Sequence, residues 1–249
     1  MALNRLPFRD PRTVARDIPG VLDALFPRLS GSLVAALNRD AFYYPGLDPV
    51  PGELVEQSRL QKAMLFELAV ARAELILSDK TEPEWAECLA IALERQSRHY
   101  DAQKLDGIEE SDRKVAEHAA RNLVSMLRRT SRAHDFPIVR SPVIPGMGWI
   151  ASGTGDFAIG KVLVEVKHTA RNFIAGDFRQ VLMYWLLKYA SAIESDDEVW
   201  TECLLLNPRR NSGLAINFDN LLHSASSNSN RVELCEALRS IVEHDIVRR

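Results

Sequence analysis

The sequence has few cysteines, no long apolar run and no excess of basic residues. Its cysteines, Cys88, Cys203 and Cys235, are far apart and odd in number, so neither a disulfide framework nor a zinc knuckle is indicated. No apolar stretch approaches the roughly 18 residues of a membrane span, and residues 1–10 lack the apolar core of a signal peptide. We therefore expect a reduced, cytoplasmic protein with no membrane partner.

The charge balance gives no sign of a nucleic-acid partner. Lys and Arg number 31 against 34 Asp and Glu, a net charge of -3, whereas nucleic-acid binders usually carry an excess of base. Of the 249 residues, 46% are hydrophobic, which excludes wholesale disorder and suits one large or two small domains. The distribution of charge matters more than its total, because residues 128–179 are predicted to form a locally basic surface that suits a phosphate backbone. This segment holds only four acidic residues against the basic set Arg128, Arg129, Arg132, Arg140, Lys161, Lys167, Arg171 and Arg179.

The first half of the sequence is predicted to be helical. Apolar residues recur at helical spacing over residues 53–77. Thr81 and Glu84 fit a capping box that begins the next helix, a third helix is expected over residues 111–129, and residues 14–37 suggest shorter helices broken by Pro and Gly. We expect this helical N-terminal region, residues 1–110, to form a partner surface, a dimer surface or part of a nucleic-acid channel.

The second half, residues 111–249, is predicted to be an α/β (α+β) domain in which helices flank a small mixed sheet. Its composition changes near residue 135 to one rich in Val, Ile, Gly and Pro. The elements expected there are short strands over residues 137–168, a helix over 175–190, strands over 202–206 and 213–218, and a last helix capped by Asn230 and ending near Val242.

Residues 155–167 predict a β-hairpin. Gly160-Lys161 suits a two-residue turn with Gly in the first central position. One face of the hairpin is then wholly apolar and must be buried, and the other gathers Asp156, Glu165 and Lys167. The apolar face consists of Phe157, Ile159, Val162, Val164 and Val166.

In this register Asp156 lies opposite Glu165, with Cβ atoms only about 5 Å apart, where like charges repel. Lys167, two residues beyond Glu165, supplies one positive charge, and a hard divalent cation such as Mg²⁺ would supply the rest. The alternative is a solvent-exposed edge hairpin with a fortuitous Glu-Lys pair. The paired acid and the clean apolar face favour a site.

These residues resemble the PD-(D/E)XK nuclease superfamily, with Gly155-Asp156 in place of Pro-Asp and Glu165-Val166-Lys167 as the second half of the motif. Gln180 and Tyr184 resemble the Gln-x-x-x-Tyr motif of its RecB-like and lambda-exonuclease-like branches, and their spacing places both on one helix face. The resemblance covers about residues 112–220 and implies a restriction-endonuclease-like core.

The resemblance also implies roles. Asp156 and Glu165 would hold Mg²⁺, with Mn²⁺ able to substitute, and Lys167 would orient or deprotonate the attacking water. Gln180 would fix the site, and Tyr184 would contact the nucleic-acid strand.

Further candidates are less closely tied to the motif. Many relatives use a glutamate from the helix before the sheet, for which Glu117 is the candidate and Glu67 a weaker substitute. Thr154, expected opposite Lys167, and the basic residues Arg171 and Arg179 would contact phosphates. His168 is expected on the other side of the strand from Lys167, and we assign it no role.

The leading hypothesis is a metal-dependent nuclease that hydrolyses phosphodiester bonds, with DNA favoured over RNA, in defence against mobile elements or in repair or recombination. The alternative is a catalytically silent nuclease-like module that binds nucleic acid or scaffolds a complex. A third reading is an unrelated helical interaction protein with a coincidental hairpin. A protein partner or a homo-oligomer is expected to use the helical N-terminal region.

Overall fold

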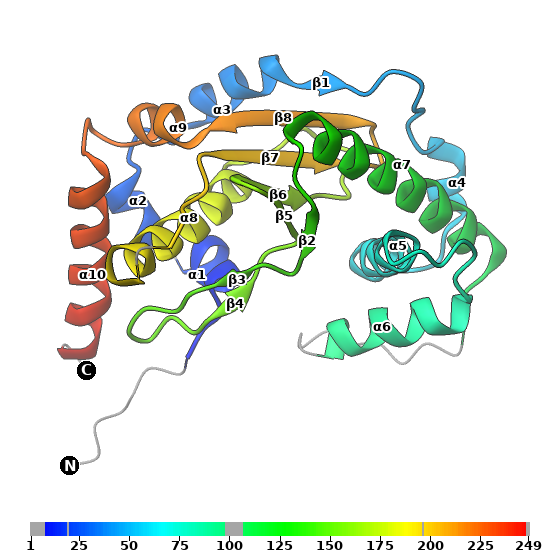
Figure 1. Cartoon of the computed structure of the whole chain (residues 1–249), viewed down its shortest axis with the longest axis horizontal. Coiled ribbons are helices and arrows are strands. Elements are labelled where there is room, and N and C mark those ends of the chain that lie inside the picture. The colour runs from blue at the N-terminus through cyan, green and yellow to red at the C-terminus, as the bar shows by residue number, and fades with distance from the viewer. Residues whose placement is uncertain (1–7, 19, 98–106, 196, 248–249) are drawn as a thin grey trace, which may run out of the picture.

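The computed structural model describes residues 8–18, 20–97, 107–195 and 197–247 and has a mixed α/β fold, as predicted (Figure 1). The strands are β1 (Phe42–Tyr43), β2 (Ile138–Arg140), β3 (Val143–Ile144), β4 (Gly153–Thr154), β5 (Phe157–Ile159), β6 (Val162–Val166), β7 (Glu202–Asn207) and β8 (Ser212–Asn217). The helices are α1 (Pro11–Asp17), α2 (Val21–Leu25), α3 (Gly31–Leu37), α4 (Gly52–Gln57), α5 (Lys62–Leu77), α6 (Trp85–Ser97), α7 (Glu110–His134), α8 (Ala175–Ser195), α9 (Phe218–Ala225) and α10 (Arg231–Val247).

The central sheet has six strands in the order β1-β8-β7-β6-β5-β2, and β3 and β4 form a separate two-stranded sheet. Strands β6 and β7 are parallel and are connected through α8, whereas the other neighbours in the central sheet are antiparallel. A parallel pair needs such a crossover, which brings the chain back along the sheet. The carboxyl end of β6 therefore lies close to the beginning of α8.

The predicted hairpin is confirmed in its register. Ile159 pairs with Val162, and Phe157 pairs with Val164. Gly160 adopts φ +53°, a conformation that favours glycine, and a Cβ at this position would meet the Phe136 ring. The side chains predicted to form the apolar face are all buried together in one cluster. Burial of this face fixes the register, because a slip by one residue would turn every side chain over.

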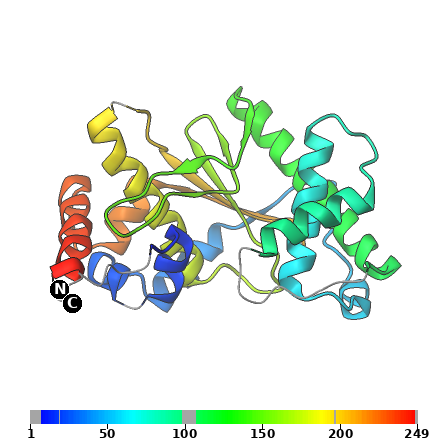
Figure 2. The ribbon, with the colours of Figure 1, turned by 90° about the horizontal axis from the view of Figure 1, so that it is seen from below.

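Helices cover both faces of the central sheet (Figure 2). The apolar face of the hairpin packs against α5 and α7, through residues such as Val70, Leu123 and Leu127. On the opposite face, Leu163 belongs to a second cluster built with α8 and with helices near both ends of the chain. Because Glu165 alternates with Val164 and Val166, it points to the α8 side of the sheet.

The helix predicted over residues 53–77 is divided into α4 and α5. The break falls where Asp112 of α7 accepts hydrogen bonds from the Ser58 hydroxyl at 2.7 Å and from the backbone N–H groups of Arg59 and Leu60. These bonds hold the chain between the helices in a non-helical path, as carboxylates often do at such positions. As a result α5 begins at Lys62, beside the pocket described below.

Other helix boundaries differ from the sequence pattern by a few residues. The helix expected from the Thr81 capping box begins only at Trp85, with Cys88 N–H donating to the Glu84 carbonyl, so Thr81 lies outside it. The last helix begins after Asn230 as predicted, and the Asn230 side chain accepts from the Glu233 N–H at 3.0 Å.

Parts of the N-terminal region join the same fold. Strand β1 pairs with β8 at the edge of the central sheet, and α1 packs on α8. This packing brings residues of α1 to the end of β6, more than a hundred positions along the chain. Within the described ranges, no helix is both long and apolar enough to cross a membrane.

The hairpin's apolar face gives a test of the fold. Phe157 is fully buried, whereas Phe136 is half exposed. We expect Phe157→Ala to lower the free energy of unfolding in urea by about 3–5 kcal/mol, because it leaves a cavity in the cluster under α5 and α7. Phe136→Ala should cost about 1 kcal/mol. Equal losses in the two variants would contradict the assigned register.

Candidate functional site

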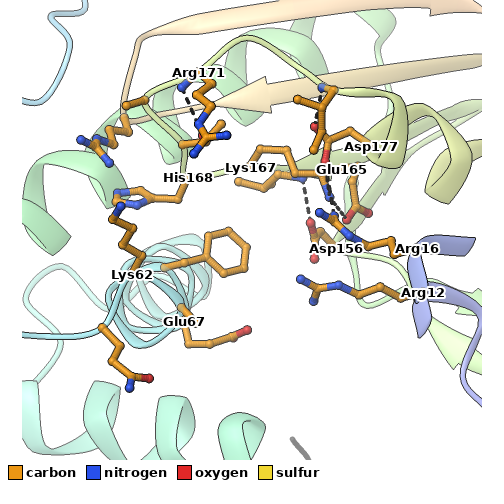
Figure 3. A pocket seen from close by; sticks show the side chains of 18 of the residues that line it. Arg12, Arg16, Lys62, Glu67, Asp156, Glu165, Lys167, His168, Arg171 and Asp177 are labelled. Atoms are coloured by element: carbon orange, nitrogen blue, oxygen red, sulfur yellow. Dashed lines mark hydrogen bonds and ion pairs between the residues drawn. The ribbon is translucent and has the colours of Figure 1, made fainter. Parts of the chain in front are cut away.

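A pocket of about 700 Å³ opens at the carboxyl end of β6, between α1, the first turns of α5 and the loop that leads into α8 (Figure 3). Glu165 and Lys167 are buried in its wall, and Asp156 lies beside them. A second, adjoining hollow is lined in part by Asp156, Glu165, Gln180 and Tyr184. The structure thus brings together Asp156, Glu165, Lys167, Gln180 and Tyr184, the residues predicted to be catalytic.

A hydrogen-bonded network connects these residues. Lys167 Nζ donates to Glu165 Oε1 and to Gln180 Oε1, both at 2.9 Å. The Gln180 amide nitrogen donates to the same Glu165 oxygen at 2.5 Å and to the Tyr184 hydroxyl at 2.9 Å. The amide of Gln180 therefore has one orientation that satisfies the cation on one side and the carboxylate on the other.

Tyr184 keeps its proton in this site. Burial, followed by the charges of Glu165 and Asp156, raises its pKa far above the ordinary value. Because its oxygen accepts from Gln180, the phenolic O–H is available to donate to a group in the adjoining hollow.

Asp156 lies at the end of the hairpin, just before β5. Its Oδ2 accepts from the Val166 N–H at 2.7 Å, which fixes the carboxylate beside the end of β6. Burial and, next, the charge of Glu165 raise the pKa of Asp156 to about 8, although Lys167, the Val166 hydrogen bond and Arg12 act in the opposite direction. The predicted repulsion between the two carboxylates is therefore present in the folded protein.

The site brings two carboxylates together beside an unsatisfied oxygen. Glu165 Oε2 is buried and has no hydrogen-bond partner among the described residues, and a buried acceptor without a partner is costly. Among the described residues no group of three or more His, Cys, Asp and Glu side chains is placed to hold a metal. Two carboxylates with water and phosphate oxygens would still satisfy Mg²⁺, which commonly keeps several waters.

The sequence did not indicate the residues that α1 and the start of α8 contribute. Arg16 Nη1 donates to Asp177 Oδ1 and to Gln180 Oε1, both at 3.3 Å, and Lys167 Nζ lies 3.8 Å from Asp177 Oδ1. Arg12 points toward Asp156 (Figure 3). Burial would lower the pKa of Arg12, but Glu165 and Asp156 together raise it above its ordinary value.

The helix glutamate at the site differs from the one favoured by the sequence. Glu117 pairs with Arg72 and with Arg121 and faces away from the pocket, whereas Glu67 of α5 lines it. Whether a residue at the edge of a helix's buried face reaches a site depends on how that helix packs, which the sequence pattern does not show. Here the face of α5, rather than that of α7, borders Asp156 and Glu165.

The predicted phosphate contacts are only partly brought to the pocket. Arg171 lines it, and Thr154 borders the adjoining hollow. Thr154 was wrongly expected opposite Lys167, because the chain turns away after Gly155 and β4 pairs Thr154 with Val143. Arg179 points elsewhere and pairs with Asp23 of α2.

The local basic surface expected from the sequence is dispersed. Arg129 donates to the Pro45 carbonyl, Arg140 to the Ser78 hydroxyl, and Lys161 pairs with Glu198. Lys167 and Arg171 are the members of that set that line the pocket. Sequence neighbours diverge here because they lie on different strands and helices.

Comparisons of the chain with protein-family models, with curated proteins and with solved structures found no significant match.

The reassigned glutamate gives a prediction. Glu117→Gln should lower the free energy of unfolding by about 2 kcal/mol, because the buried Arg72 guanidinium loses its charged partner. We expect no change in any activity of the pocket at Asp156. Urea unfolding and activity of the same preparation test this, and an activity loss at temperatures where the variant stays folded would contradict the placement.

The raised pKa of Asp156 predicts a dependence of stability on pH. In chelator, the folded protein holds a proton on Asp156 that the unfolded chain releases above about pH 4. This group therefore stabilises the fold at low pH, and its contribution falls as the pH rises to about 8, by up to about 1.4 kcal/mol per pH unit.

The comparison variant is Asp156→Asn, which cannot titrate. Its free energy of unfolding should fall less between pH 5 and pH 8 than that of the wild-type protein, so that the variant becomes relatively more stable toward pH 8. Parallel stability curves for the two proteins would show that Asp156 does not titrate in this range.

Proposed function

We propose that the protein is a metal-dependent nuclease that hydrolyses phosphodiester bonds, with DNA favoured over RNA, on a restriction-endonuclease-like core. One observation carries the proposal: the carboxylates of Asp156 and Glu165 converge beside Lys167, and one buried Glu165 oxygen has no partner among the described residues. A structural role alone would not account for two neighbouring acids whose burial and mutual repulsion raise the pKa of Asp156 to about 8.

Asp156 and Glu165 would hold the divalent cation, Mg²⁺ or Mn²⁺, through the unpartnered Glu165 oxygen and the Asp156 carboxylate. Bound there, it would neutralise charge on the phosphate and acidify the attacking water. Glu67, on the facing wall of the pocket, is placed to contribute a further oxygen directly or through water. In this proposal the glutamate that a helix contributes to the site is Glu67 of α5, not Glu117 of α7.

Each polar neighbour then has a part in hydrolysis. Lys167 Nζ, held between Glu165 and Gln180, would orient the water and stabilise negative charge on the pentavalent phosphorus. Gln180 positions Lys167, and the O–H of Tyr184 would donate to the strand from the adjoining hollow. Arg12 of α1 lines both the pocket and the adjoining hollow, where it would meet the phosphate.

The alternative is a module with the same fold that binds nucleic acid or scaffolds a complex without cleaving. It would have no use for the Asp156 and Glu165 pair, whose mutual repulsion costs stability when no cation is bound. Pathway assignments, defence against mobile elements or repair and recombination, rest on the resemblance alone.

The test is cleavage of plasmid, linear and single-stranded DNA and of RNA, with Mg²⁺ or Mn²⁺ and with chelator. We expect metal-dependent cleavage that falls at least about 100-fold in Lys167→Ala, because the group that stabilises the developing charge is lost. Lys161→Ala, which removes an exposed lysine on the same hairpin, is the matched control.

Cleavage that persists unchanged in Lys167→Ala would refute the assigned site. Metal binding without cleavage of any of these substrates would favour the non-catalytic alternative.

A further inference from the structure

The end of the pocket away from Asp156 and Glu165 is cationic. Lys62, Arg171 and Arg209 line this end, and none of them forms an ion pair with another described residue. In Figure 3 Asp156, Glu165 and Asp177 lie across the pocket from Lys62 and His168, whereas Glu67 lies below Lys62 on the α5 wall. The acids at the Asp156 end have Arg12, Arg16 and Lys167 among them, whereas Lys62, Arg171 and Arg209 have no paired acid among the described residues.

Arg209 is the least easily explained of these side chains. It is half buried, and burial lowers its pKa. A desolvated cation with no counter-ion is unfavourable unless an anion comes to it. Its backbone is held in place, because the Val50 N–H donates to the Arg209 carbonyl at 2.8 Å.

His168 lies beside Arg209 and is equally unsatisfied. Both of its ring nitrogens are shielded from solvent and lack a hydrogen-bond partner among the described residues. Burial and, next, Arg209 lower the pKa of His168 to about 4, so the ring is neutral at pH 7 and carries one N–H that can donate. The exposed Lys62 side chain lies beside the ring, and both residues line the pocket (Figure 3).

The first turn of α5 adds to the positive potential. Gln61 precedes this helix without capping it, so the N–H groups at its start are not satisfied by a side chain. Such a helix end favours an anion.

Two hydrogen bonds fix the part of the cluster that holds His168 and Arg209 without a ligand. The Asn207 amide donates to the Thr169 carbonyl at 2.8 Å, and Arg210 donates to the Asn172 side chain at 2.7 Å. These bonds join the loop that carries His168 to the turn that carries Arg209. The site is therefore largely formed in advance, which lowers the cost of binding.

We propose that Lys62, His168, Arg209 and the start of α5 form a second phosphate site, which holds a phosphodiester of a nucleic-acid strand next to the one that lies at Asp156 and Glu165. This inference rests on the proposed nuclease function and deepens it. A strand fits better than a free phosphate, because successive phosphates would occupy both ends of one continuous pocket. Arg171, at the rim, would meet the strand as it leaves.

The test measures binding of fluorescently labelled single-stranded DNA to the full chain in chelator, at several salt concentrations. Arg209→Gln and Lys62→Gln should each bind roughly tenfold more weakly. Each should also lower the slope of log K against log salt by about 0.7, the value for one phosphate contact on a single strand. The matched controls are Arg239→Gln and Lys114→Gln, which remove exposed cations on α10 and α7 and should leave both quantities unchanged.

Lys62 is exposed, so its variant keeps the test valid if Arg209→Gln does not fold. His168→Phe keeps the ring volume, removes both nitrogens and should also weaken binding. Unchanged affinity and slope in Arg209→Gln and Lys62→Gln would overturn the second site, whereas Mg²⁺-dependent cleavage by the wild-type protein would leave the nuclease proposal standing.

The opposite result also distinguishes the second phosphate site from the nuclease proposal. Arg209-dependent binding without any cleavage would support the second site and count against catalysis. If inorganic pyrophosphate raises the melting temperature of the wild-type protein but not of Arg209→Gln, and DNA does not bind, the assignment to a strand is wrong.

Discussion

The ammonium group of Lys167 lies inside the protein against the carboxylate of Glu165, and the surrounding structure is arranged to make this pair tolerable. A buried ion pair is stable only when the remaining donors and acceptors are matched. Gln180 supplies the match from α8, with its carbonyl toward Lys167 and its amide toward Glu165. The parallel crossover between β6 and β7 is what brings α8 over this point.

The hydrogen bonding of this ion pair is incomplete on the Glu165 side. One oxygen of Glu165 accepts from Lys167 and Gln180, and the other has no partner among the described residues. The pKa of Asp156, beside it, is raised by burial and, next, by the Glu165 charge. A divalent cation would give the second Glu165 oxygen a partner and would offset the repulsion between the two carboxylates. The local energetics therefore favour the proposed metal-dependent chemistry.

The hairpin could be predicted from the sequence because its apolar residues alternate without exception and a glycine marks the turn. Gln180 and Tyr184 could be assigned to one face because their spacing is that of a helix turn. Arg12 and Arg16 could not be found in this way, since their distance from Asp156 along the chain says nothing of the packing of α1 on α8. The choice of Glu67 over Glu117 likewise depends on how two helices pack.

His168 shows where the strand pattern stops being informative. Alternation placed it on the opposite side of the sheet from Lys167, but β6 ends at Val166 and the loop turns the ring into the pocket. The same loop is held to the end of β7 by the hydrogen bond from the Asn207 amide to the Thr169 carbonyl. Residues just past a strand end are therefore natural contributors to a site at that edge.

The central claim, that Asp156 and Glu165 together hold a divalent cation, is tested most directly by calorimetric titration of the protein with Mn²⁺ at pH 7 in two buffers of different ionisation enthalpy. Because Asp156 has a pKa of about 8 in the metal-free protein, binding should release about one proton per ion. Glu165→Gln should abolish both the binding and the release. Absence of Mn²⁺ binding to the wild-type protein, or equal binding by the variant, would contradict the account.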